Sequence, residues 1–335
     1  MQNMHVADHQ KNRLNFMTLE QFDTHEDFKN HVLDGFRSDP KSLASHCFYN
    51  HEGSSIFDKI CALPEYYLTR SEIDILENRT EEIVAEIPEE GIIAELGNGS
   101  PLKIKKILDR LFERQEDVHY APIDISCDYM KKSVLELVET YPNLSVTAIG
   151  GKYERGIQFL EKTETPKTIL WLGSSIGNMP DDEAVKFLSR IRKMMRPNDC
   201  FIIGMDLEKD WDMIKEAYDD QQGVTAEFNM NILKRINEEL KADFDIDSFR
   251  HDPVCNIKES RMESYLTSVK DQNVFLRSLD LKIPFKKNES VHVEVSCKYS
   301  EDKIKKMAKQ SGLHLDRQWF DSNKWFSLNL FRTER

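Results

Sequence analysis

The chain has 335 residues, of which 39% are hydrophobic and 31% charged, with a formal net charge of −13. This length allows one large domain or two modest ones with a packed core, and the charge argues against nucleic acid or an anionic membrane as a partner. Six scattered cysteines without a C-x-x-C pair, no apolar run of membrane-spanning length and a polar start without a signal-peptide core predict a cytoplasmic protein with reduced thiols, no disulfide framework and no zinc site.

The predicted elements begin after a polar segment, residues 1–15, that we expect to be loosely ordered. Helical patterns follow at 28–36, 54–61 and 71–86, the last ending just before Pro88. From 92 to 207, helices alternate with apolar strands, which are predicted at 92–96, 118–125, 145–149, 168–172 and 200–207. Strands separated by helices of about 10 to 15 residues predict an α/β fold with a doubly wound, mostly parallel sheet.

The pattern changes after Asp210. Residues 211–240 are predicted to be almost wholly helical, whereas 261–267 and 290–297 alternate like strands. A helix at 303–310 and a hairpin at 313–331 are expected to close the chain. We therefore divide the chain into the polar segment 1–15, a substrate-binding lobe from 16–70 and 209–298, and a Rossmann-like core from 71–208 and 299–335.

The most informative motif is the turn Gly97-Asn98-Gly99, directly after the strand at 92–96 and before a helix starting near Leu102. Glycines at this corner let the backbone approach a ligand at the helix N-terminus. The dinucleotide fingerprint would need a third glycine where the chain has Leu102. A bare G-x-G with an acid at the strand end suits a cofactor without a pyrophosphate, and the best candidate is S-adenosylmethionine (SAM). A nicotinamide-dependent dehydrogenase is the alternative that Leu102 opposes.

Two further turns follow predicted strands. Asp124 ends the second strand, where an acid can accept both ribose hydroxyls, although it can also cap the helix starting near Ser126. The segment 172–178 (LGSSIGN) ends the fourth strand, and Asn178 there offers a donor and an acceptor. An ordinary turn capped by Asn178 is the alternative. Ligands lie beyond the carboxyl ends of strands in open parallel sheets, so this turn is expected near the reactive end of the cofactor.

Aromatic and polar residues of the second lobe suggest a substrate. Tyr49, Phe57 and Tyr66 are close in sequence, and such side chains suit methylammonium groups, with core packing as the alternative. Glu294 and Ser296 share one face of a valine-rich strand, where they either face water or bind a polar ring. The chain has no G-x-S-x-G, H-E-x-x-H or Walker motif, and its ten histidines are scattered. The sequence therefore shows no set of residues suited to acyl transfer or to metal binding.

Together these motifs resemble the histidine Nα-methyltransferase family of ergothioneine biosynthesis, from about Tyr49 to Phe331. The segments that carry the resemblance are 53–58 (GSSIFD), 63–67 (LPEYY), 69–72 (TRSE), 95–100 (ELGNGS), 173–178 (GSSIGN), 217–220 (AYDD), 223–225 (GVT), 228–229 (FN) and 294–298 (EVSCK). Each is weak alone, but their joint order and spacing are specific.

The resemblance implies an enzyme that uses SAM to trimethylate the α-amine of L-histidine, giving hercynine. It implies a small amino-acid substrate, and we expect a monomer. Tyr49 and Asn178 would act at the amine. The implied substrate-binding residues are Phe57, Tyr66, Gly173, Asn178, Tyr218, Thr225, Ser264, Glu294 and Ser296. The implied cofactor-binding residues are Tyr49, Gly97, Asn98, Lys103, Asp124, Lys152 and Tyr153.

Two positions depart from the family pattern. Lys152-Tyr153 stands where such enzymes often carry an acid-aromatic pair at the adenine, and Ser264 stands where they often have Met beside the imidazole. Relatives methylate tryptophan-type or tyrosine-type amino acids, which is one alternative; a non-catalytic SAM-binding regulator is another. Glu294 and Ser296 favour imidazole, because a buried carboxylate facing an apolar indole would be poorly satisfied.

Overall fold

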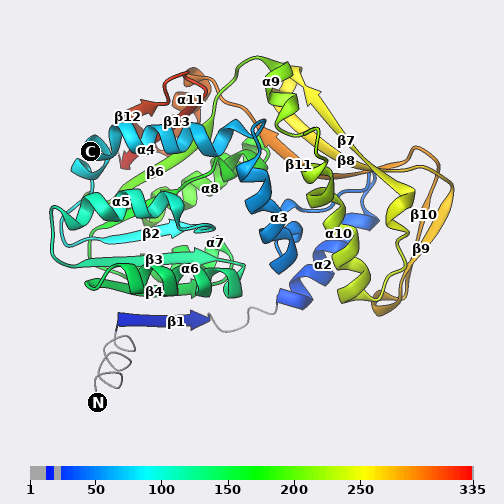
Figure 1. Cartoon of the computed structure of the whole chain (residues 1–335), viewed down its shortest axis with the longest axis horizontal. Coiled ribbons are helices and arrows are strands. Elements are labelled where there is room, and N and C mark those ends of the chain that lie inside the picture. Colours follow the sequence, from blue (N-terminus) through cyan, green and yellow to red (C-terminus); the bar gives the residue numbers. More distant parts are fainter. Residues whose placement is uncertain (1–12, 19–23, 334–335) are drawn as a thin grey trace. The chain divides into compact units, whose positions relative to one another are not determined.

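The structure is a computed structural model that describes residues 13–18 and 24–333, and it divides into two compact units. Unit 1 comprises Met1–Glu20, Leu68–Glu208 and Tyr299–Arg335. Unit 2 comprises Gln21–Tyr67 and Lys209–Lys298. Each unit therefore combines segments that are far apart in the sequence (Figure 1).

Unit 1 contains an eight-stranded sheet with helices. Its elements are β1 (Leu14–Thr18), α4 (Tyr67–Ala85), β2 (Ile92–Leu96), α5 (Leu102–Phe112), β3 (Val118–Asp124), α6 (Cys127–Thr140), β4 (Leu144–Gly150), α7 (Tyr153–Glu161), β5 (Lys167–Trp171), η2 (Ser175–Asn178), α8 (Asp181–Met194), β6 (Cys200–Asp206), α11 (Glu301–Ser311), β12 (Leu313–Phe320) and β13 (Phe326–Thr333).

The sheet order is β1-β4-β3-β2-β5-β6-β13-β12. Strands β1 to β6 pair in parallel, and the β12–β13 hairpin adds antiparallel to β6. The chain runs outward from β2 through β3 to β4 and then returns to β5 on the other side of β2. This reversal places a topological switch point between β2 and β5, where ligands bind in open α/β sheets.

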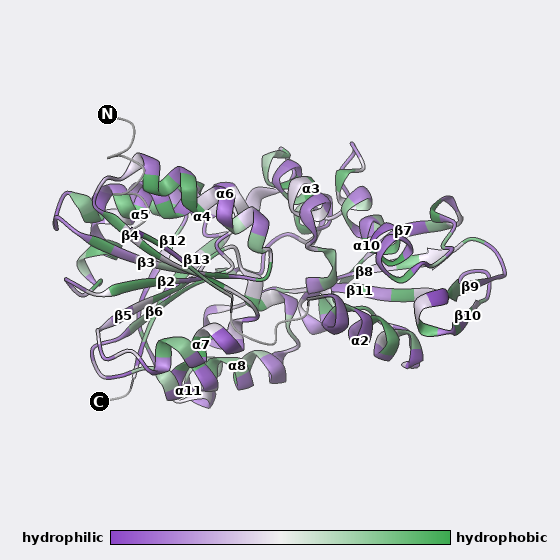
Figure 2. Ribbon diagram, turned by 90° about the horizontal axis from the view of Figure 1, so that it is seen from below, coloured by the Kyte–Doolittle hydropathy of each residue, from purple (hydrophilic) through white to green (hydrophobic). Residues whose placement is uncertain are grey.

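Burial on both faces of this sheet explains the apolar strands. Every residue of β2, β5 and β6 is buried. Helices α4, α5 and α6 lie on one face and α7, α8 and α11 on the other, and the apolar strands run between these layers (Figure 2). The helices turn apolar stripes to the sheet; α5, for example, buries Ile104, Ile107, Leu108 and Leu111. A doubly wound, mostly parallel sheet is therefore the fold of unit 1, as predicted.

Unit 2 is built from helices and two small antiparallel sheets. Its elements are α2 (Thr24–Arg37), η1 (Ser45–Phe48), α3 (His51–Ala62), α9 (Trp211–Glu216), α10 (Val224–Leu240), η3 (Ile246–Ser248), β7 (Phe249–Asn256), η4 (Ile257–Glu259), β8 (Arg261–Ser268), β9 (Gln272–Leu276), η5 (Arg277–Leu279), β10 (Leu281–Phe285) and β11 (Ser290–Cys297). One sheet has the order β11-β8-β7, and β9 pairs with β10 in a two-stranded hairpin. The buried helix α10 packs against α3 and lies along β7 and β8.

The structure differs from the sequence prediction in three places. Leu14–Thr18 is a strand paired in parallel with β4, so the expected loose segment 1–15 and the assignment of 16–18 to the substrate lobe are wrong there; residues 1–12 lie outside the described part. The predicted helix 211–240 is broken, because Gly223 adopts φ +73° and Asp220 caps the new helix α10. Strands β7, β9 and β10 were not anticipated: β9 and β10 have only five residues each, and β7 and β10 contain a proline, which argues against a strand in the sequence.

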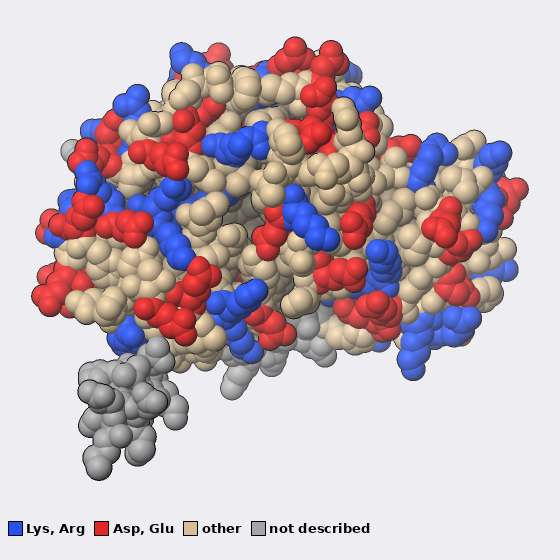
Figure 3. Space-filling view, in the orientation of Figure 1, with Lys and Arg blue, Asp and Glu red and all other residues tan. Residues whose placement is uncertain are grey.

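Acidic and basic side chains lie intermingled on the face of the molecule shown in Figure 3. Many form surface ion pairs, such as Lys186 with Asp182 and Arg190 with Glu154. No helix within residues 13–18 and 24–333 has both the length and the apolar character needed to cross a membrane.

Candidate cofactor and substrate sites

The glycine turn after β2 has the backbone geometry that the sequence predicts. Gly97 and Gly99 adopt φ values of +71° and +45°, which favour glycine. A Cβ on Gly97 would also lie 2.6 Å from the hydroxyl of Tyr153. Tyr153, at the start of α7, packs edge-on to Trp171 and Phe187. The structure thus brings two predicted cofactor residues together, Gly97 and Tyr153, and gives both of them a packing reason as well.

Asp124 joins this turn from the end of β3. Its Oδ1 accepts the Ser126 N–H at 2.7 Å and its Oδ2 lies 3.5 Å from the Gly99 nitrogen. Burial raises the pKa of Asp124, and these backbone donors oppose the rise. The carboxylate of Asp124 therefore bonds both to Ser126, the residue before α6, and to the glycine turn, and it joins these two segments.

Asn98 is buried, and the nitrogen of its side-chain amide is hydrogen-bonded whereas the oxygen is not. Its Nδ2 donates to the Ser133 hydroxyl at 3.2 Å, but its Oδ1 has no hydrogen-bond partner among the described residues. Buried polar atoms are nearly always satisfied by protein, water or ligand. The turn therefore presents glycine backbone, a carboxylate and a buried amide oxygen, which are groups that fit a nucleoside such as the adenosyl part of SAM.

An ion pair links the segments that follow β2 and β5 at the switch point. Lys103, in the first turn of α5, lies 2.6 Å from the carboxylate of Glu72, which is wholly buried. The same carboxylate accepts the Gly173 N–H at 2.9 and 3.0 Å. The family resemblance implied roles for both Lys103 and Gly173, and Glu72 of α4 bonds to both of them.

A second buried acid, Glu95, lies at the end of β2. The hydroxyl of Tyr120 donates to its carboxyl group. Burial raises the pKa of Glu95 to about 8, although Tyr120 and Lys103 act to lower it. Glu95 is therefore mostly protonated at neutral pH.

The remaining predicted residues of unit 1 are half-buried. Asn178 ends η2, the short helix that follows the turn at Gly173 and Ser174. Ser174 takes a left-handed conformation (φ +58°), and its hydroxyl accepts the Asp206 N–H at 2.9 Å. Lys152 stands at the N-cap of α7, directly before Tyr153.

In unit 2, the predicted aromatic residues form one cluster around Phe228 of α10. Its ring centroid lies 5.6 Å from that of Tyr49 and 5.7 Å from that of Phe57. The ring of Tyr66 follows at 6.1 Å from Phe57. Burial, and then the neighbouring Tyr218, raise the pKa of Tyr66 well above its ordinary value. Tyr66 therefore stays a neutral phenol and can donate its proton in a hydrogen bond.

The predicted polar residues Tyr218 and Ser296 meet in the same unit. Their hydroxyl oxygens lie 2.7 Å apart, and each accepts a hydrogen bond of 2.9 Å from Lys298 Nζ. All three side chains are buried, and Lys298 has no exposed surface. The ammonium group also lies 4.7 Å from the centroid of the Tyr218 ring.

Glu294 lies on β11, paired across the ladder with Ser264 of β8. The Ser264 hydroxyl donates to its Oε2 at 3.4 Å. Burial raises the pKa of Glu294 to about 7, while Lys298, Ser264 and Asn229 lower it. Ser264 therefore contributes to the carboxylate a hydrogen-bond donor that a methionine at this position would lack.

Thr225 is placed by the cap of α10. Asp220 accepts the N–H groups of Val224 and Thr225 at 2.9 and 2.7 Å, and these bonds lower its pKa against the effect of burial. The Thr225 carbonyl then accepts from the Asn229 amide at 3.0 Å. This cap explains the motifs 217–220 and 223–225 structurally.

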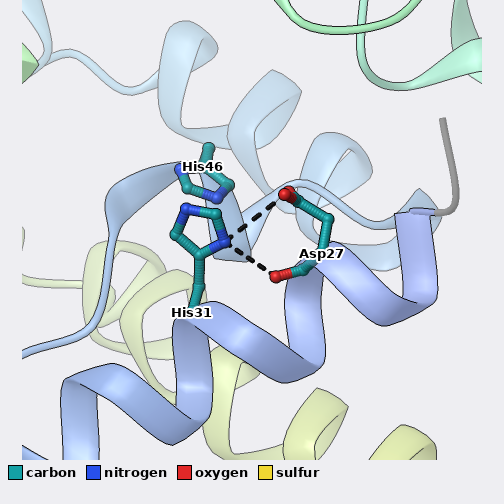
Figure 4. A group of neighbouring side chains, drawn as sticks. All are labelled: Asp27, His31 and His46. Carbon is teal, nitrogen blue, oxygen red and sulfur yellow. Dashed lines mark hydrogen bonds and ion pairs between the residues drawn. The ribbon is translucent and has the colours of Figure 1, made fainter. Parts of the chain in front are cut away.

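A group of potential metal ligands lies elsewhere in unit 2. Asp27 and His31 of α2 and His46 of η1 each offer one ligand atom within 4.8 Å of the others (Figure 4). His31 Nδ1 lies 2.7 Å from the Asp27 carbonyl oxygen one turn earlier, and its ring packs edge-on to His46 at 4.4 Å. Because the helix already engages this nitrogen, we interpret the group as packing of α2 on η1. The spacing of the histidines in the chain does not predict this group.

Several residues of these clusters had no role predicted from the sequence. The sequence does mark Glu72 as unusual, because it lies on the same buried helix face as Ile75 and Leu76, where acidic residues are rare. Lys298 directly follows a valine-rich strand. Glu72 and Lys298 both lie in segments that carry the family resemblance. Phe228 and Asn229 form the quoted segment 228–229, but no spacing rule assigned them a role.

A doubly wound sheet with a glycine turn, an acid after the next strand and no dinucleotide fingerprint defines the class of Rossmann-like, SAM-dependent methyltransferases. Comparison with known proteins specifies the family. The sequence model of a family described as “Histidine-specific methyltransferase, SAM-dependent” matches residues 28–333.

Two curated relatives cover almost the whole chain. Histidine N-alpha-methyltransferase of Mycobacterium tuberculosis (strain CDC 1551 / Oshkosh) is 36% identical over 303 residues, which are 89% of this chain and 92% of the relative. That of Mycolicibacterium smegmatis is 34% identical over 305 residues, 91% of this chain and 94% of the relative. Ergothioneine biosynthesis protein 1 of Neurospora crassa is 28% identical over 302 residues, 88% of this chain but 34% of that protein. The chain belongs to the histidine-specific, SAM-dependent methyltransferase family, and it is an N-methyltransferase.

Proposed function

We propose that this enzyme transfers methyl groups from SAM to the α-amine of L-histidine and, after three transfers, forms hercynine. Unit 1 would hold the cofactor and unit 2 the amino acid. The observation that carries the proposal is the polar cluster of unit 2, in which Glu294 and Ser296 lie on one face of β11 among buried partners. Its similarity to the mycobacterial histidine N-alpha-methyltransferases supports the same substrate.

The chemistry of these side chains suits an imidazole. A neutral imidazole has one N–H donor and one acceptor nitrogen. Glu294 offers a carboxylate that accepts, and Ser296 offers a hydroxyl that can donate. An indole or a phenol lacks this pair of groups, and its ring would leave the carboxylate poorly satisfied. We therefore favour histidine over tryptophan-type and tyrosine-type substrates.

The rest of the amino acid needs other groups. Tyr66, which keeps its proton, would donate a hydrogen bond to the substrate carboxylate. Tyr49 and Asn178 remain our predicted contacts of the amine, and the aromatic cluster around Phe228 would favour the methylated ammonium product. The amine must be neutral to attack, and since these residues include no strong base, water is the expected proton acceptor. Positioning then supplies much of the acceleration.

In unit 1, Gly97, Asn98 and Asp124 would hold the adenosyl part of SAM, with Lys152 and Tyr153 near the adenine. Bound SAM supplies an electrophilic methyl group on a positively charged sulfur. The Lys103–Glu72 pair would fix the backbone at Gly173, so that the turn after β5 keeps its place beside the turn after β2.

The test is a product assay with purified enzyme, SAM and each of the twenty amino acids, read by mass spectrometry. We expect histidine to gain up to three methyl groups and the other nineteen to react far more slowly. Accumulation of a singly methylated histidine would contradict trimethylation. Faster methylation of tryptophan or tyrosine would overturn the substrate, and no methylated amino acid at all would favour a regulatory SAM-binding protein.

A further inference from the structure

Lys298 is the one wholly buried lysine in the described part of unit 2, and nothing in the proposed reaction has used it so far. It follows β11 directly, and its backbone N–H donates to the Ser260 carbonyl at 2.7 Å, which fixes the start of its side chain. Burying an ammonium group is costly unless hydrogen bonds replace its water. Here the Tyr218 and Ser296 oxygens and the face of the Tyr218 ring surround it.

Counting protons in this triad fixes the direction of two of its three hydrogen bonds, those from Lys298. An ammonium group can only donate, so both hydroxyl oxygens accept from Lys298. The bond of 2.7 Å between the two hydroxyls uses one of their two protons. Whichever oxygen accepts that bond then has both lone pairs occupied, and its own proton must be donated outside the triad.

The acidity of the two hydroxyls decides which one points outward. A phenol is a stronger hydrogen-bond donor than an alcohol, and an alcohol oxygen is the better acceptor. Tyr218 therefore donates to Ser296, and Ser296 accepts from both Tyr218 and Lys298. The Ser296 hydroxyl is left as a donor only.

We propose that Lys298 is a positioning residue that makes Ser296 an obligatory donor, so that the enzyme selects a substrate ring with an unprotonated acceptor nitrogen. This rests on the proposed function, because it takes the imidazole of histidine as the ring. Glu294 accepts from the ring N–H while Ser296 donates to the other nitrogen. Glu294 and Ser296 together therefore bind one tautomer of the neutral ring. Without Lys298, one lone pair of the Ser296 oxygen would be free, so that this oxygen would also accept a hydrogen bond from a ring N–H.

The experiment compares histidine with the 2-linked and 3-linked β-pyrrolylalanines, which keep one ring N–H but lack the acceptor nitrogen. The wild-type enzyme is expected to prefer histidine in kcat/KM by about tenfold to a hundredfold, since a buried donor left unsatisfied is costly. In Lys298→Met this preference should fall to within about threefold, through a higher KM for histidine. Affinity for S-adenosylhomocysteine, measured by calorimetry, should not change.

Lys209→Met is the matched control. Lys209 also donates to a tyrosine hydroxyl, that of Tyr67 at 2.9 Å, and lies 4.2 Å from the centroid of its ring. This variant should keep the full preference for histidine. A loss of the preference here would show that removing any lysine that packs on a tyrosine ring has this effect.

The outcomes separate the two proposals. A wild-type enzyme that does not methylate histidine refutes the proposed function, and this inference with it. A wild-type enzyme active on histidine, with the preference unchanged in Lys298→Met, refutes the role of Lys298 alone. If Lys298→Met does not fold, Lys298→Gln takes its place: a single amide cannot donate to both oxygens as an ammonium does, so an intermediate preference supports the role and an unchanged preference overturns it.

Discussion

Glu294 is expected to destabilise the ligand-free protein while it binds the substrate, and Glu294→Gln tests this. Burial raises the pKa of this carboxyl group from 4.5 to about 7. The folded protein therefore binds more protons than the unfolded chain between these two values, so stability falls as the pH rises through this window. At 1.36 kcal/mol per pKa unit, the rise corresponds to about 3 kcal/mol above pH 7. Glutamine has the same shape and no charge, so the variant does not lose this stability.

The assay is urea unfolding at pH 5 and pH 8, followed by circular dichroism. At pH 5 the variant and the wild type should differ little, because Glu294 is protonated in the folded state. At pH 8 the variant should be more stable by up to about 3 kcal/mol, yet bind histidine at least about tenfold more weakly. Glu227→Gln, an exposed glutamate on α10, is the control and should show neither effect. If the free energies of unfolding of the variant and the wild type differ by the same amount at both pH values, the argument is refuted, because the Glu294 carboxyl group is then not desolvated.

Two other changes test unit 1. Glu72→Gln places an amide donor against both Lys103 and the Gly173 N–H, so affinity for S-adenosylhomocysteine should fall by about tenfold or more in calorimetry, and an unchanged affinity would contradict the link. Gly97→Ala meets the Tyr153 hydroxyl at 2.6 Å and a positive φ, and should abolish cofactor binding. Adding Tyr153→Phe removes the clash but not the backbone strain, so binding should recover only in part; full recovery would show that the strain costs little.

The parallel sheet could be predicted from the sequence because burial on both faces leaves nothing but apolar residues in strands such as β2 and β5. The glycine turn could be predicted equally well, since the positive φ values at Gly97 and Gly99 favour glycine. Strand β1 was missed because Asn15 and Phe16 are exposed at the sheet edge, where pairing by backbone hydrogen bonds leaves little pattern in the side chains.

Within the site, family motifs identified Tyr218, Glu294 and Ser296, but not how they are connected. The Lys298 bonds to Tyr218 join residues 80 positions apart, and no local spacing rule predicts such a pair. The same holds for Glu72, which bonds to Gly173 across 101 positions. Spacing reveals faces of helices and strands, whereas buried polar networks depend on long-range packing that only the folded structure shows.

The place of β13 in the sheet has a consequence for synthesis on the ribosome. The outer edge of β6, a strand with every residue buried, pairs with β13 and with no earlier strand in the described chain. Until residues 326–333 leave the ribosome, the nascent protein carries an open and apolar strand edge, of the kind that pairs with other chains. Chains stopped by premature termination before β13 should therefore aggregate, and a chaperone that shields strand edges should matter most in the interval between the synthesis of β6 and that of the last hairpin.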